Sequence, residues 1–292
     1  MLGELKDIPK TRIYRMLRTG EVRVNSGRVK QDYRLNLNDI VRVPPVFIQQ
    51  VADKSRIKLS TELKTRLINS IIYEDEFVII MNKPQGLAVH AGSGEAFGII
   101  EAMREMRANQ EFLELVHRLD KPTSGCLVLA KDHRVLRDLH SQFNQHHVRK
   151  KYTALIKGRL METRRVDLAL KKNELESGER KVHAVDTGKD AITIFNPIKQ
   201  FNEVTLAGAE LKTGRTHQIR VHAAAIGHPL AGDDKYGDRQ FNRALKRFGL
   251  KRLFLHAASL TLKLPNTNKP LTFEADLPTD LQNVLQKLEK SG

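Results

Sequence analysis

The stretch from residue 116 to residue 131 constrains the fold more strongly than any other part of the sequence. Its second half is an apolar run bounded by Gly125 and Lys131, a pattern that predicts a buried strand. Its first half is polar and rich in turn formers, and Pro122 fixes one backbone angle there. Asp120 is the only carboxylate of this loop. Polar residues on a loop held by a rigid strand are a common way to mount chemistry, although an Asp that caps a turn fits the same pattern.

The charge of the chain indicates a polyanionic partner. Fifty Lys and Arg against 34 Asp and Glu give a net charge of +16, and clustered cations bind phosphates through release of counterions. A basic surface kept only for solubility is the alternative. Aromatic residues make up 5% of the chain and Trp is absent, so an array of stacking platforms for single strands is not expected. Nucleic acid held by shape and charge fits better.

Size and composition favour a globular protein. At 292 residues, with 40% hydrophobic residues, the chain can form one large domain and a small one. It contains no apolar run as long as a membrane helix needs and no signal-peptide pattern. Cys126 is the single cysteine, so an internal disulfide is impossible, which fits a reducing compartment. We therefore expect a cytoplasmic protein that does not bind membranes, and a monomer.

Residues 1–45 read as a small basic module, with ten Lys and Arg against five acids. A helix is predicted from Pro9 to Gly20, because Ile13, Met16 and Leu17 recur at helical spacing. Alternating residues then predict short strands at 21–25 and 39–43, with a tight turn at 25–27. A basic helix and hairpin packed on the main domain is the alternative interpretation.

The rest of the chain predicts a linker and one α+β domain. Residues 46–68 lack clear periodicity and are predicted to be a linker with a short helix, and the domain covers 69–292. Strands are predicted at 77–81, 125–131, 152–156, 204–212 and 253–264, and helices at 97–108 and 133–145. Such interleaving favours a mixed sheet. Residues 160–190 suggest no function.

Metal and cofactor chemistry are poorly supported. His217 and His222 lie about 140° apart around a helix, so they cannot form an i, i+4 ligand pair. One cysteine excludes cysteine-based zinc sites. Neither a Walker-type loop nor a Gly-x-Gly-x-x-Gly motif is present. We therefore expect no metal and no cofactor, and a chemistry that depends on a carboxylate, arginines and a tyrosine.

Four separated motifs between residues 70 and 275 closely resemble the RluA group of pseudouridine synthases. These are Lys83-Pro84-x-Gly86, His117 to Gly125, Lys151-Tyr152-x-Ala154, and Gly214-Arg215-Thr216-His217-Gln218-Ile219-Arg220. The resemblance implies a pseudouridine synthase catalytic domain with a mixed, mainly antiparallel sheet. It also implies an isomerase that cleaves the N1–C1′ bond of uridine, turns the base and rejoins it through C5.

The same resemblance assigns roles to single residues. Asp120 matches the catalytic carboxylate, Arg220 the arginine that pairs with it, and Tyr152 the tyrosine that stacks on the flipped base and assists proton removal from C5. Arg118, Arg215 and His117 are the expected RNA contacts in this domain. From local pattern alone, each would be read as an ordinary surface or strand residue.

The module at the N-terminus resembles the S4 RNA-binding domain through Arg18-Thr19-Gly20-Glu21-Val22-Arg23-Val24-Asn25 and Asn38-Asp39-Ile40-Val41-Arg42-Val43. Its expected RNA contacts are Arg12, Arg15 and Arg23. S4 domains usually begin with a further helix, so we expect a module shortened at its N-terminus. The two resemblances together imply large-subunit ribosomal RNA as the substrate. The alternatives are a synthase acting on transfer RNA, a non-catalytic S4-type RNA-binding protein and, less well supported, a metal-dependent nuclease.

Overall fold

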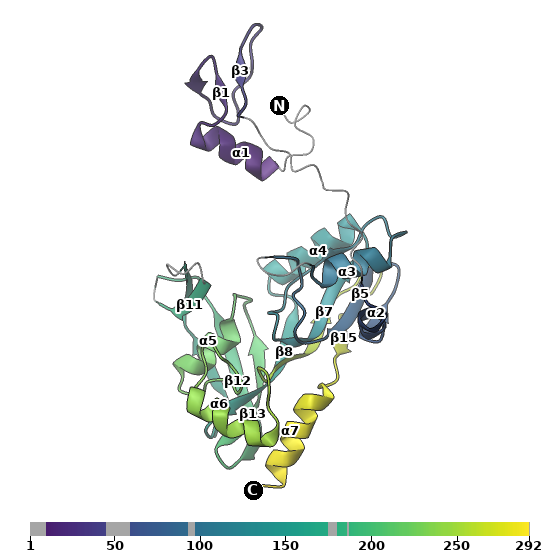
Figure 1. Cartoon of the computed structure of the whole chain (residues 1–292), viewed down its shortest axis with the longest axis vertical. Coiled ribbons are helices and arrows are strands. Elements are labelled where there is room, and N and C mark those ends of the chain that lie inside the picture. The colour runs from purple at the N-terminus through teal and green to yellow at the C-terminus, as the bar shows by residue number, and fades with distance from the viewer. Residues whose placement is uncertain (1–9, 45–58, 93–96, 175–179, 186, 292) are drawn as a thin grey trace. The chain divides into compact units, whose positions relative to one another are not determined.

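The computed structural model describes residues 10–44, 59–92, 97–174, 180–185 and 187–291 (Figure 1). The chain divides into two compact units, residues 1–57 and 58–292. No helix in the described ranges is long and apolar enough to cross a membrane.

The first unit consists of one helix and a small antiparallel sheet. Helix α1 (Lys10–Thr19) is followed by β1 (Arg23–Val24), β2 (Gly27–Arg28) and β3 (Val41–Arg42), in the order β2-β1-β3. Ile13 and Met16 are buried against Val22, as the helical spacing predicted. Asn25 and Ser26 have φ values of 48° and 67°, and positive φ at both central residues is typical of a two-residue hairpin turn.

The second unit is built on a ten-stranded mixed sheet. Its main path runs β4-β5-β7-β14-β8-β13-β12-β9, while β15 pairs with β14 and β6 with β7. Its strands are β4 (Ile71–Glu74), β5 (Val78–Lys83), β6 (Glu114–Leu115), β7 (Ser124–Ala130), β8 (Arg149–Lys157), β9 (Arg164–Asp167), β12 (Ile192–Phe201), β13 (Val204–Leu211), β14 (Leu255–Leu262) and β15 (Leu271–Glu274). Only β7 and β14 pair in parallel, so the predicted mixed, mainly antiparallel sheet is confirmed for the described residues.

Strand β7 is an interior strand of this sheet, between β5 and β14, and all seven of its residues are buried. Gly125 has a φ of 113°, and a Cβ atom there would lie 2.3 Å from the carbonyl oxygen of Ala257 on β14. Only glycine permits this close approach of the two parallel strands. The loop that carries Asp120 therefore enters the sheet at a fixed point.

Seven helices and a short 3₁₀ turn complete the described parts of the chain, and six of these helices belong to the second unit. They are α2 (Thr61–Ile68), α3 (Ile99–Met106), α4 (His133–Asn144), α5 (Gln218–Ala225), α6 (Arg239–Leu245) and α7 (Thr279–Glu289), with the 3₁₀ turn at Lys246–Phe248. Helices α2, α3 and α4 gather near β5 and β7 (Figure 1). Helix α5 packs on Ala154 and Ile156 of β8, and α7 packs on Leu155. Successive residues of a strand face opposite ways, so α5 and α7 cover opposite faces of the sheet.

One expectation about the chain needs correction. The short helix predicted within 46–68 is present as α2, but it belongs to the second unit, where the Ser60 side chain caps it and Leu67 is fully buried. The second unit therefore begins at residue 58 and not at 69, while the remainder of the predicted linker up to residue 58 lies outside the described residues. The polar range 160–190 suggested no function from its sequence. It contains β9 and a hairpin of β10 (Leu170–Glu174) and β11 (Arg180–Ala184), whose Leu170 and Val182 pack on Val221 of α5.

Candidate active site

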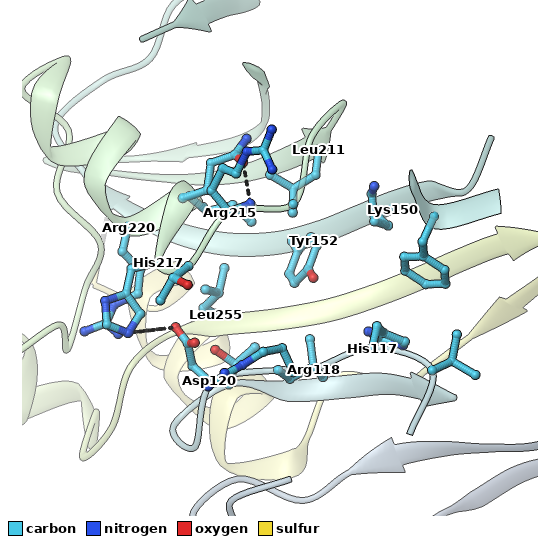
Figure 2. Close-up of a pocket in the computed structure, with 18 of the residues that line it drawn as sticks. His117, Arg118, Asp120, Lys150, Tyr152, Leu211, Arg215, His217, Arg220 and Leu255 are labelled. Carbon is cyan, nitrogen blue, oxygen red and sulfur yellow. Dashed lines mark hydrogen bonds and ion pairs between the residues drawn. The ribbon is translucent and has the colours of Figure 1, made fainter. Parts of the chain in front are cut away.

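A pocket of about 540 Å³ lies where the Asp120 loop, β8 and the start of α5 meet. Figure 2 shows Asp120 and Arg220 at one end of this pocket, Tyr152 in the middle and Lys150 at the other end. Polar and apolar side chains both line it. Such a combination is typical of a pocket that holds a ligand group in a fixed orientation.

The Asp120 loop is fixed by buried neighbours on both sides. Leu119 is buried, and the Asp120 carbonyl accepts the Thr123 N–H at 3.0 Å, which closes a turn around Pro122. Ser124 is buried and bonds His256 Nδ1 through its hydroxyl at 3.0 Å. The Asp120 side chain keeps 18% of its surface exposed, so the carboxylate points into the pocket while its backbone is held.

A buried lysine ties this loop to a second motif. Lys83 is fully buried, and its Nζ donates to the carbonyl oxygens of Pro84, Leu87 and Lys121 at 3.0, 2.8 and 3.2 Å. Burial lowers the pKa of Lys83 to about 7, although the negative charge of Asp120 opposes this effect. Three acceptors match the three hydrogens of an ammonium group, so Lys83 holds the residue next to Asp120 in place.

Arg220, at the start of α5, connects two carboxylates. Its Nη1 lies 3.4 Å from Asp120 Oδ2, while its Nε and Nη2 donate to Oδ2 and Oδ1 of Asp233, both at 2.8 Å. The guanidinium also lies over the ring of Tyr236, 5.0 Å from its centroid. The predicted contact between Arg220 and Asp120 is therefore present, but the bidentate partner of Arg220 is Asp233.

Asp233 was not among the predicted site residues. It is 1% exposed, and its Oδ1 also accepts the backbone N–H groups of Lys235 and Tyr236 at 2.9 and 3.0 Å. Burial alone would raise the pKa of Asp233, but the hydrogen bonds and charge of Arg220 bring it below its ordinary value. Asp233 is thus a buried, ionised carboxylate that fixes the direction of Arg220.

His217 also faces Asp120 and was predicted only as part of a motif. Its Nε2 lies 3.6 Å from Asp120 Oδ2, and its Nδ1 lies 2.8 Å from the hydroxyl of Tyr236. That hydroxyl oxygen accepts the Val182 N–H at 3.0 Å. The simplest assignment lets the Tyr236 hydroxyl donate to Nδ1, which puts the ring hydrogen on Nε2, toward Asp120. Burial lowers the pKa of His217 below its ordinary value, although the negative charge of Asp120 opposes this effect, so the ring is neutral at pH 7.

Tyr152 projects from β8 into the middle of the pocket (Figure 2). Burial and the negative charge of Asp120 raise the pKa of Tyr152 above its ordinary value, so its hydroxyl stays protonated at neutral pH. A half-buried aromatic ring beside a carboxylate can stack on a planar base while the carboxylate reaches the attached sugar.

The structure brings six of the nine predicted site residues together. Asp120, Tyr152, Arg220, Arg118, Arg215 and His117 all line the pocket. Arg118 is exposed, and Arg215 Nε donates to the Asp190 carbonyl at 3.1 Å. His117 accepts the Val128 N–H on Nε2 at 3.2 Å and stacks on Phe143, and burial lowers its pKa to about 3. It therefore lines the pocket as a neutral ring.

The other three predicted residues belong to the first unit. Arg15 is exposed on α1. Arg23 donates to the carbonyl oxygens of Gly20 and Ser26 at 3.2 and 3.3 Å, so its guanidinium is partly used to hold the hairpin. The side chain of Arg12 lies outside the part of the chain that the structure describes.

Comparison with known proteins identifies the family. Residues 77–225, which include Asp120, Tyr152 and Arg220, match the model of the RNA pseudouridylate synthase family. The chain belongs to this family. Its relatives include the ribosomal large subunit pseudouridine synthase C of Pasteurella multocida, 47% identical over 99% of this chain and 89% of the relative. The Escherichia coli K12 protein of the same name is 45% identical over 99% of this chain and 91% of the relative.

A solved structure supports the same membership. Human RNA pseudouridylate synthase domain containing 4 is 27% identical, with a TM-score of 0.64 over 78% of this chain and 96% of the human chain. The protein is therefore an RNA pseudouridine synthase, an isomerase, and the carboxylate, the aromatic ring and the arginine of the pocket all lie within the segment that matches the family.

Proposed function

We propose that this enzyme isomerises uridines of large-subunit ribosomal RNA. The observation that carries the proposal is its similarity over nearly the whole chain to synthases named for that substrate. The net charge of +16 also favours a polyanionic partner such as RNA. No feature of the described residues favours transfer RNA.

Asp120 is the catalytic residue in this proposal. In the reaction, the N1–C1′ bond of uridine breaks, a C5–C1′ bond forms, C5 loses its proton and N1 gains one. The Asp120 carboxylate acts on the ribose side, by attack on C1′ or by removal of a ribose proton. A nucleophilic or basic carboxylate must stay ionised in a site closed by substrate. Arg220 at 3.4 Å supplies the positive charge that keeps it so.

Tyr152 supports the base in this scheme. The uridine must leave its stack, which costs a few kcal/mol that RNA binding has to supply. The Tyr152 ring offers the departing base a new stacking partner. Its hydroxyl is protonated at neutral pH, because its pKa is raised, so stacking is its main contribution. Arg118 fills the space left in the RNA or contacts a phosphate, and Arg215 and His117, which also line the pocket, contact the same strand.

The first unit acts as an S4-like RNA-binding module in this proposal. Its helix and three short strands carry exposed cations, among them Arg15 and Arg18, and cations on one side of a helix suit a phosphate backbone. Arg12 and Arg23 complete the proposed contact set. We further infer a monomer that works in the cytoplasm on RNA, without DNA or membrane partners, because a ribosomal RNA substrate and a single cysteine fit that setting.

The substrate is tested by tritium release from transcripts made with 5-tritiated uridine. C5 loses its hydrogen only when the base is rejoined through that carbon. Release from large-subunit ribosomal RNA, and not from transfer RNA, is the expected result. Release from transfer RNA alone would show that transfer RNA, and not ribosomal RNA, is the substrate. Tight RNA binding without any release would favour a non-catalytic binding protein.

A further inference from the structure

Lys150 occupies the end of the pocket that the proposed chemistry leaves unused. It precedes Tyr152 by two positions on β8, so both side chains face the same side of the sheet. In Figure 2 it lies at the far end from Asp120 and Arg220, with His117 on the same side. The residue is 7% exposed, which makes it one of the few buried cations of the described chain.

No acceptor neutralises this ammonium group in the free protein. Within the described ranges, Nζ of Lys150 makes no hydrogen bond or ion pair, and its one recorded contact is the Phe143 ring, 5.8 Å from the centroid. The charge that shifts its pKa belongs to Lys212, which is also positive. Burial and Lys212 together lower the pKa of Lys150, and Lys150 in turn helps to lower the pKa of His117. This end of the pocket is therefore electropositive.

The other buried cations of the pocket region are fully satisfied. Lys83 has three carbonyl acceptors and Arg220 has two carboxylates. A buried charge without a partner is costly, so Lys150 is an exception that needs a reason. Among the described residues, every side-chain nitrogen or oxygen that is fully buried has a hydrogen-bond partner. Because Nζ of Lys150 has no such partner, it is not fully buried. It therefore reaches the surface of the pocket that Lys150 lines, where a bound group can contact it.

We propose that Lys150 binds a phosphate of the RNA strand next to the target uridine. The inference rests on the proposed function, since it takes the pocket to hold a flipped uridine against Tyr152. Two positions along a strand separate the residues by about 7 Å, which is within reach of a phosphate that flanks the stacked nucleotide. An ammonium group binds phosphate as a point charge, and the neutral carbonyls of uracil would leave its charge unbalanced.

The neighbouring residue provides a matched control. Lys151 is exposed on the opposite face of β8, so Lys151→Met removes the same charge from the same strand outside the pocket. Lys150→Met is expected to weaken RNA binding on the order of tenfold, as loss of a charged hydrogen bond does. It should also reduce the slope of log Kd against log salt by about 0.7–0.9, one phosphate contact. Lys151→Met should have smaller effects on the RNA affinity and on the salt slope. Lys150→Arg should keep most of the affinity that Lys150→Met loses.

The rate separates this role from a chemical one. Tritium release under single-turnover conditions, with enzyme above Kd, should stay within a few-fold of wild type for Lys150→Met. A saturating rate that collapses while Kd stays unchanged would overturn the proposal, because Lys150 would then act on the reacting base. Equal affinities of Lys150→Met and Lys151→Met would overturn it as well.

A neutral linkage in the RNA identifies the phosphate. In an oligoribonucleotide that spans the modified uridine, a methylphosphonate replaces one flanking phosphate at a time. At one flanking linkage, the neutral group should weaken binding by wild type about as much as Lys150→Met does, and should not weaken Lys150→Met further. Additive losses at every flanking linkage would overturn the contact. Tritium release by wild type reports separately on the proposed function, so either idea can fail alone.

Discussion

The guanidinium of Arg220 is bound more closely by Asp233 than by Asp120. Two parallel contacts of 2.8 Å join it to Asp233, and a single contact of 3.4 Å joins it to Asp120. A bidentate pair fixes both the position and the plane of a guanidinium. Asp233 therefore acts as a positioning residue. It leaves Nη1 of Arg220 aimed at Asp120.

Asp233→Asn is expected to destabilise the fold by about 3–5 kcal/mol, because it leaves Arg220 buried without its main counter-charge. It should also lower the saturating rate of tritium release, since Arg220 loses its fixed direction. Asp234→Asn is the matched control, because Asp234 is exposed, and we expect its effect on stability to stay within about 0.5 kcal/mol. Denaturant unfolding of the three proteins measures the difference. Equal stability of the two variants would contradict the role of Asp233.

The same pair predicts how stability depends on pH. Because Arg220 holds the pKa of Asp233 below its ordinary value, the pair stabilises the folded state above the unfolded-state pKa of about 4. That stabilisation is lost as the pH falls through the lower folded-state pKa. The stability gap between wild type and Asp233→Asn should thus be full at pH 6–7 and shrink in acid. A gap that widens in acid would rule out an ionised Asp233.

Tyr236→Phe tests the chain of hydrogen bonds behind His217. The change removes the hydroxyl that joins the Val182 N–H to His217 Nδ1, so His217 loses the partner that fixes its ring and its tautomer. We expect the saturating rate to fall on the order of tenfold, about the worth of one hydrogen bond, with little change in RNA affinity. Thermal unfolding checks that the fold is intact. An unchanged rate would mean that the orientation of His217 has no part in the reaction.

Two variants of Tyr152 distinguish a role in base stacking from a role in proton transfer. Burial and Asp120 keep its hydroxyl protonated, since its pKa is raised, so Tyr152→Phe should retain activity within a few-fold and keep the pH profile of wild type. Tyr152→Ala should lose about 1–3 kcal/mol of base stacking, read as weaker binding and slower release. An inactive Phe variant with normal RNA binding would show that the hydroxyl, rather than the ring, is required.

Sequence patterns predicted the elements whose signal is local. Strand β7 and helix α4 follow from an apolar run and from helical spacing, and both lie within a residue or two of their predicted bounds. The parallel pairing of β7 with β14 joins residues that are 132 positions apart, Ser124 and His256. No local pattern carries such a pairing. The strands between 160 and 190 were missed because their residues are mostly polar.

The residues of the site also fall into those that the sequence could reveal and those that only the structure reveals. The Asp120 and Arg220 motifs are long and unusual, so they could be found in the sequence, and the structure brings the two residues into contact. Asp233 stands in a turn where an aspartate is ordinary, and only its burial beneath Arg220 distinguishes it. Its position directly after Gly232 is the only feature of the sequence that could have drawn attention to Asp233. Lys150 was hidden in a basic run whose neighbours, Arg149 and Lys151, are exposed.

The most direct test of the account compares wild type with Asp120→Asn on large-subunit ribosomal RNA that carries 5-tritiated uridine. The variant keeps the shape of the side chain and removes its charge. Wild type should release tritium, and the rate for Asp120→Asn should fall on the order of 10³-fold or more, while RNA binding in a filter assay stays close to that of wild type. Release by Asp120→Asn at a rate near that of wild type would contradict the assignment of Asp120 as the catalytic residue.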